Sequence, residues 1–142
     1  MSEGKFEKLT QSDKALYGPR KLILCGFAAG TQVHFSKVLA YAGLPELPLI
    51  WAAEALADDE IGQIMALPAD TGADTDSALP RAIIVGGITE NELHNLMNTC
   101  RASGMQSALW AVLTPASEKW TLRQLITELA AERTALSKKK PV

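Results

Sequence analysis

Four short apolar runs, separated by helical patterns, constrain the fold of this sequence more than any other feature. The runs lie at residues 22–25, 47–51, 82–85 and 108–113, and each contains β-branched or aromatic residues without strict apolar/polar alternation. Runs of this kind are typical of strands that are covered on both faces of a sheet, as in α/β proteins. Pro48 has no N–H group to offer a neighbouring strand, so we expect the second run to begin a strand or to lie at a sheet edge.

Two capping boxes predict where helices begin. The boxes are Thr89–Glu92 and Thr121–Gln124. In each, the threonine hydroxyl can accept a hydrogen bond from the backbone N–H of the fourth residue, and the side chain of the fourth residue can accept one from the backbone N–H of the threonine. The first of these helices should end near Gly104, because glycine adopts the left-handed conformation of a helix end. Two further helices are predicted, one at about residues 31–42 and a short one after Asp58.

Each half of the chain therefore has the order strand, helix, strand, helix. Residues 22–26 align with residues 82–86 at an offset of 60, and Gly43 aligns with Gly104 at an offset of 61. We predict that one building block occurs twice within a single α/β domain. The predicted organisation is a polar N-terminal tail at 1–19, a domain at 20–136 with repeats at 20–67 and 81–130 and a linker at 68–80, and a basic tail at 137–142.

Two architectures satisfy this order of elements. In the first, all four strands are parallel and helices cover both faces of the sheet. In the second, the two halves interleave and form a ferredoxin-like antiparallel α+β sandwich. The apolar strands and the extra helix after each second strand favour the parallel sheet, and the directions of the strands stay open.

Charge and cysteine usage exclude several classes of protein. The 142 residues have a formal net charge of -2, whereas a dedicated nucleic-acid binder is usually basic. No apolar run approaches the roughly 18 residues that span a membrane, so no membrane partner is expected. Cys25 and Cys100 lie far apart without Cys-x-x-Cys or His-x-x-x-His spacing, so we expect no metal and no cofactor. The N-terminus lacks the basic and apolar regions of a signal peptide, which predicts a cytoplasmic protein.

One stretch of the second half has a pattern known from a protein family. The pattern consists of Ala-Leu-Trp-Ala-Val-Leu-Thr-Pro at 108–115, Trp-Thr-Leu at 120–122, Leu125, Glu128 and Leu129. It resembles the bacterial family catalogued as domain of unknown function 3783, and the strand before it and Glu-Asn-Glu-Leu at 90–93 also fit. The similarity covers about residues 81–133. It implies a bacterial domain to which no reaction is attached.

Three groups of residues follow predicted strands, where open α/β sheets bind ligands. The candidate contact residues are Gly26, Gly30, Thr31, Gly86, Gly87, Thr114, Pro115 and Trp120. The glycines precede helices, whose first N–H groups can hold a phosphate, although tight strand-to-helix turns also account for them. The residues after the last strand offer a hydroxyl group and an aromatic wall to a ligand or partner, or else a rigid turn that fixes the start of a helix.

The sequence favours a binding role over catalysis. None of the four strands ends in Asp, His or Lys, and no base can be assigned to Thr114 or Cys25, so we expect no catalytic residue and lean against an enzyme. The leading hypothesis is a protein-interaction or self-association domain, whose partner is another protein or a second copy of the chain. The alternative is a domain that senses a small ligand or nucleotide at the carboxyl ends of the strands.

Overall fold

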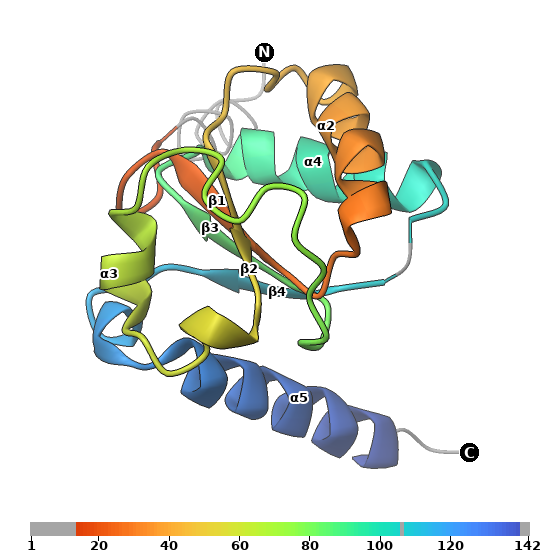
Figure 1. Cartoon of the computed structure of the whole chain (residues 1–142). Helices are drawn as coiled ribbons and strands as arrows, with labels where there is room; N and C mark the ends of the chain where they lie inside the picture. The colour runs from red at the N-terminus through yellow and green to blue at the C-terminus, as the bar shows by residue number, and fades with distance from the viewer. Residues whose placement is uncertain (1–13, 106, 140–142) are drawn as a thin grey trace.

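The computed structural model describes residues 14–105 and 107–139 of the chain. Its four strands form one sheet in the order β2-β1-β3-β4 (Figure 1). The strands are β1 (Lys21–Cys25), β2 (Leu49–Ala52), β3 (Ala82–Gly86) and β4 (Leu109–Val112). Each coincides with one of the predicted apolar runs. Pro48 directly precedes β2, which is an edge strand, so the position predicted for this proline is confirmed.

Helices cover both faces of the sheet. The helices are α2 (Gln32–Tyr41), α3 (Ile61–Met65), α4 (Glu90–Ala102) and α5 (Leu122–Lys139), and the short 3-10 turns are η1 (Ala29–Thr31), η2 (Glu54–Leu56) and η3 (Ser117–Lys119). In Figure 1, α2 and α4 lie on one side of the sheet, and α3 and α5 lie on the other side. The mixed α/β class and the helices on both faces are therefore confirmed.

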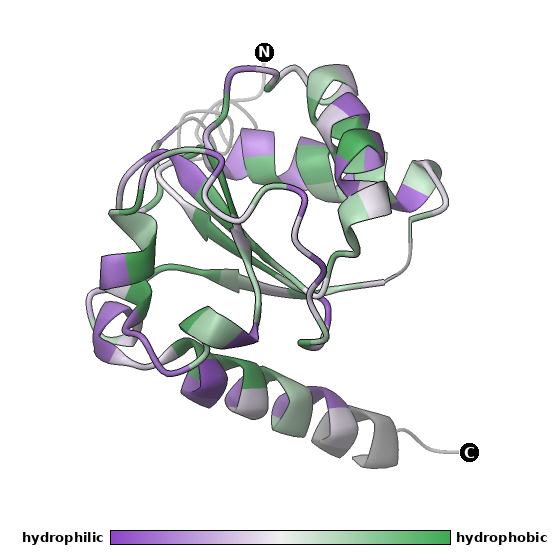
Figure 2. Cartoon of the chain, in the orientation of Figure 1, coloured by the Kyte–Doolittle hydropathy of each residue, from purple (hydrophilic) through white to green (hydrophobic). Residues whose placement is uncertain are grey.

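Alternate residues of the central strands enter two separate apolar clusters. Leu22 and Leu24 pack with side chains of α2 and α4, whereas Ile23 and Cys25 pack with side chains of α3 and α5. The hydropathy colouring of Figure 2 shows the strands as mostly apolar between helices whose outward sides are polar. Burial on both faces explains why these strands contain no polar alternation.

The prediction of a parallel sheet is wrong at the centre of the molecule. β1 pairs parallel with β2, and β3 pairs parallel with β4, but β1 and β3 run antiparallel with Ile23 opposite Ile84. The ferredoxin-like alternative does not fit either, because the two strands of each half are neighbours rather than interleaved. The apolar runs could not decide this, since they report burial on both faces and not strand direction.

Both predicted capping boxes are present. The N–H of Glu92 donates to the Thr89 hydroxyl (3.0 Å), and the N–H of Gln124 donates to the Thr121 hydroxyl (3.1 Å). In both boxes the side chain of the fourth residue accepts from the N–H of the first. These contacts satisfy N–H groups that have no partner inside a helix, so α4 and α5 begin where the sequence places them.

The two halves have matching strand registers. Leu22 lies beside Leu49 in the first half, and Ile83 lies beside Trp110 in the second. All four side chains pack into the apolar cluster next to α2 and α4, which fits an offset of 61 between the halves. At this offset Gly26 corresponds to Gly87, and both have positive φ angles (77° and 70°). At the predicted offset of 60, Leu22 would correspond to Ala82, which packs on the other face of the sheet with α3 and α5. A shift of one residue would turn every strand side chain toward the opposite face.

Part of the predicted N-terminal tail lies against the second half. The N–H of Leu16 donates to the Ile88 carbonyl (2.7 Å), and the N–H of Gly87 donates to the Tyr17 carbonyl (3.2 Å). Residues 1–13 of that tail, and residues 140–142 of the basic tail, lie outside the described residues.

Candidate functional site

The first predicted contact group lies where β1 ends and consists of Gly26, Gly30 and Thr31. The N–H of Gly26 donates to Ser77 Oγ (3.1 Å), and the N–H of Ala29 donates to the Asp76 carboxylate (2.7 Å). Both acceptors belong to the predicted linker, residues 68–80. An N–H group at the start of a helical turn attracts an anion, and here the chain supplies its own carboxylate at the place predicted for a phosphate.

The glycines of the second predicted contact group, Gly86 and Gly87, lie at the opposite end of the sheet from the first group, because β3 is antiparallel to β1. The chain segment before β1 covers them. A Cβ atom on Gly86 would lie 2.6 Å from the Pro19 carbonyl oxygen, and one on Gly87 would clash with the backbone of Arg20. These glycines therefore allow two backbone segments to approach closely. The structure does not bring the two predicted glycine turns together.

Thr114, Pro115 and Trp120 follow β4. The Thr114 N–H donates to Ser117 Oγ, and the Ser117 N–H donates to Thr114 Oγ1, each at 3.0 Å. These two hydroxyl groups thus close a turn. Trp120 is 36% exposed and lines a surface hollow of about 260 Å³ with residues of α5. The Trp120 carbonyl accepts a hydrogen bond from the N–H of Ile61 (2.9 Å), which connects the turn after β4 to the start of α3.

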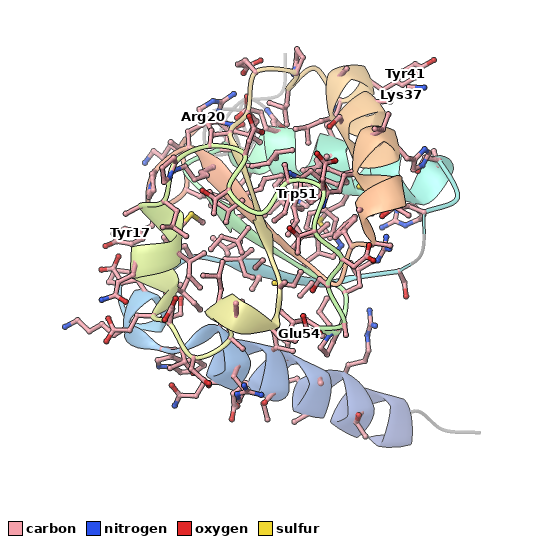
Figure 3. All side chains as sticks on the ribbon, viewed as in Figure 1. Tyr17, Arg20, Lys37, Tyr41, Trp51 and Glu54 are labelled. Carbon is pink, nitrogen blue, oxygen red and sulfur yellow. The ribbon has the colours of Figure 1, made fainter. Side chains whose placement is uncertain are left out.

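The outer edge of β2 is covered by the predicted linker. The N–H of Trp51 donates to the Thr71 carbonyl, and the N–H of Asp70 donates to the Leu49 carbonyl, both at 2.8 Å. Figure 1 shows this segment running along β2. Farther along, the Ala78 N–H donates to the Glu54 carboxylate (2.8 Å), and Figure 3 shows Glu54 beside that turn. Residues 68–80 therefore form an ordered edge cover rather than a free linker.

The outer edge of β4 is not covered in this way. The N–H groups of Leu109 and Leu113 point toward β3, so those of Trp110 and Val112 point outward. Within residues 14–105 and 107–139, no backbone hydrogen bond reaches the outward N–H and C=O groups of Trp110 and Val112. The side chains of both residues are partly exposed. The sheet therefore has one covered edge and one open edge.

A cavity of about 310 Å³ lies beside the start of β4. Its lining residues are Met97, Cys100, Arg101, Met105, Ser107, Ala108, Trp110 and Arg133. Arg133 donates to the Ala108 carbonyl (3.2 Å), and Arg101 donates to the Asn98 side chain (3.0 Å). Among the described carboxylates, none forms an ion pair with either arginine. The cavity thus combines apolar walls with two guanidinium groups that lack an anionic partner.

A smaller cavity of about 200 Å³ shares Met105 with the first. It is lined by Phe27, Thr31, His34, Arg81, Gly104 and Met105. The guanidinium of Arg81 lies over the Phe27 ring, 4.1 Å from its centre, and burial lowers the pKa of Arg81. Thr31 is the predicted contact residue that lines this cavity. Sequence reasoning did not join the other lining residues into a site, because they come from three separate segments and the apolar ones have the pattern of core residues.

Neither cysteine is poised for nucleophilic chemistry. Burial raises the pKa of the Cys25 thiol to about 12 and that of Cys100 to about 11, so both remain protonated at neutral pH. No three His, Cys, Asp or Glu side chains of the described part of the chain cluster as metal ligands would. In that same part, no helix combines the length and the apolar character needed to cross a membrane.

Comparison with known proteins gives one result, and it concerns the half with the open edge. No curated protein and no solved structure matches this chain. The matched region begins just before β3 and runs through β4 into α5, so it includes the open edge and all the lining residues of the larger cavity. Residues 81–136 match the family described as Domain of unknown function (DUF3783), which confirms the resemblance predicted for this half.

Proposed function

We propose that this chain is a self-associating module in which β4 of one copy pairs antiparallel with β4 of a second copy. The observation that carries the proposal is the difference between the two sheet edges. Residues 70 and 71 occupy the backbone groups of β2, whereas Trp110 and Val112 of β4 offer theirs to a partner. An uncovered edge strand is a ready template for pairing with another chain.

The free backbone groups select one register. In an antiparallel pair about a two-fold axis, Trp110 of one copy would face Val112 of the other, with the axis at Ala111. A register shifted toward the start of β4 needs the Ala108 carbonyl, which Arg133 occupies. A register shifted toward the end needs the Thr114 N–H, which Ser117 occupies. The favoured register forms four hydrogen bonds and continues the sheet from four strands to eight.

Removing a single outward N–H group tests this pairing. Val112→Pro deletes a donor that points away from β3, so the hydrogen bonds within the chain remain. Val112→Thr keeps the N–H group and the β-branched shape, and serves as the matched control. In sedimentation equilibrium, we expect a dimer for the native chain and for Val112→Thr, and a monomer for Val112→Pro. A monomeric native chain would overturn the proposal.

A cross-link tests the register itself. Ala111 would face its own copy at a position without intermolecular hydrogen bonds, where Cα atoms lie about 4.5 Å apart, within the range of a disulfide. We expect Ala111→Cys to form a covalent dimer under mild oxidation and Val112→Cys to form much less. The native cysteines do not interfere, because both are buried. Equal cross-linking of the two variants would exclude this register.

We also infer that the two halves are copies of one unit. The matching registers support this, as do the positive φ angles of Gly43 and Gly104 (84° and 76°) at the ends of α2 and α4. β4 is then the counterpart of β2. The segment after α3 returns to cover β2, whereas α5 packs on the face of the sheet and leaves the edge of β4 free.

A further inference from the structure

We infer that the larger cavity, beside the start of β4, binds a small molecule that has an apolar body and a single oxyanion group, either a carboxylate or a phosphate monoester. Its volume of about 310 Å³ lies at the lower end of the range for ligand sites, which suits a small molecule and not a dinucleotide. This inference concerns a site inside one copy of the chain and does not rest on the proposed pairing of β4.

The walls of the cavity supply the apolar part of the site. Met97 comes from α4, Met105 from the loop after it, and Trp110 from β4, and all three side chains are only partly buried. Thioether side chains are flexible and polarizable, so they adapt to an apolar body and contact aromatic rings favourably. Cys100 also lines the cavity and is 5% exposed.

The charges at the mouth of the cavity supply the specificity for an anion. Arg101 comes from α4 and Arg133 from α5, and each forms one hydrogen bond to a neutral acceptor. Since a guanidinium has five N–H donors in a planar fork, most donors of both side chains remain available for a carboxylate or phosphate. Arg81 adds a third positive charge on the other side of Met105, also without an ion pair among the described residues.

Calorimetric titration with three probes of one shape tests the inference. The probes are naphthoate, naphthyl phosphate and the neutral naphthylmethanol. We expect at least one anion to bind about tenfold more tightly than the alcohol, because only an oxyanion can engage the two arginines. The comparison between the two anions identifies which oxyanion the site prefers. Equal binding of all three probes, or no binding, would overturn the inference.

Variants locate the site. We expect Arg101→Gln and Arg133→Gln each to weaken binding of the preferred anion about tenfold. Arg123→Gln is the matched control, because Arg123 also lies on α5 but pairs with Asp58 outside the cavity. Among the described residues, the Arg101 side chain hydrogen-bonds only to the exposed Asn98, so we expect its replacement to leave the fold intact even if Arg133→Gln disturbs the loop that Arg133 holds.

A structural readout separates this site from the proposed self-association. Addition of the preferred anion should shift the methyl resonances of Met97 and Met105 in both the native chain and Val112→Pro. A shift in the native chain alone would mean that the site needs a second copy, which contradicts the inference. Unchanged methionine signals together with measurable heat would place binding elsewhere and would equally contradict it.

Discussion

At the scale of single residues, the ion pair between Arg20 and Glu92 also takes part in the N-terminal cap of α4. The Arg20 guanidinium donates to both carboxylate oxygens of Glu92 (2.7 and 2.8 Å), and the same carboxylate accepts the N–H of Thr89 (2.9 Å). Hydrogen bonding by Arg20 holds the pKa of Glu92 at about 2. The pair therefore fastens the segment before β1 to the first turn of α4.

The stabilisation from Glu92 should depend on pH. Its pKa is lower in the folded chain than its ordinary value of 4.5, so its contribution is complete above that value and is lost as the pH falls toward 2. We expect Glu92→Gln to lower the free energy of unfolding by roughly 1 kcal/mol at pH 7, since both side chains are partly exposed. Urea denaturation at pH 7 and pH 3 should show the difference from the native chain shrinking at the lower pH.

The control for this measurement is Glu128→Gln. Glu128 is exposed on α5 and forms no ion pair with a described residue, so its replacement should change stability little at either pH. A loss from Glu92→Gln that is the same at both pH values would contradict the assignment to the carboxylate charge.

At the scale of elements, the segment at 68–80 behaves as part of the sheet edge. Asp70 and Asp74 have positive φ angles (69° and 67°), and Gly72 has a φ angle of 80°. These backbone conformations direct the N–H of Asp70 and the C=O of Thr71 toward β2. Small polar residues predict a loop here correctly, but they do not reveal that the loop covers an edge.

Gly72 is the position on which this cover depends. A Cβ atom there would collide with the Trp51 carbonyl, and the positive φ angle disfavours any other residue. We expect Gly72→Ala to lower the free energy of unfolding by roughly 2 kcal/mol or more and to speed hydrogen exchange at the Trp51 amide. The matched control is Gly30→Ala, where a Cβ atom meets nothing within 4 Å, and its effect should stay within about 0.5 kcal/mol. Unchanged Trp51 exchange in Gly72→Ala would contradict the role of this segment.

At the scale of the whole molecule, two βαβ halves meet along one antiparallel pair of strands. Ile23 lies opposite Ile84, and these two residues also correspond to each other at the offset of 61. This pairing is consistent with the two-fold relation that we propose between the halves. Within the sheet, one edge of β1 and one edge of β3 are each covered by the strand of the other half.

This relation predicts how one half behaves alone. A fragment of residues 80–139 would expose the edge of β3 that β1 covers in the full chain. We expect the fragment to form a homodimer in which β3 pairs with its own copy about Ile84, because the two halves present equivalent edges. Sedimentation equilibrium of the fragment with Val112→Pro, which removes pairing through β4, measures this directly. A folded monomer or an unfolded chain would show that the halves are not equivalent units.

Much of the fold can be predicted from local patterns. The capping boxes at Thr89 and Thr121 and the apolar stripes placed α4 and α5 correctly, and the apolar runs located all four strands. The sequence also predicts turns at Gly26 and Gly87, either as tight strand-to-helix turns or as ligand contacts. Each of these features depends on residues within one or two helical turns of each other, so the sequence alone contains the relevant physics.

The candidate sites depended on contacts that no local pattern records. Asp76 reaches the turn after β1, Arg133 reaches the start of β4, and residues 70 and 71 reach the edge of β2. Thus the sequence by itself determined which segments are strands and helices and which faces they bury. Only the tertiary structure decided the antiparallel centre, the covered and open edges and the cationic cavity. Strand direction and edge coverage depend on how distant segments pack, and burial on both faces of a strand is the same whether the strand runs parallel or antiparallel to its neighbour.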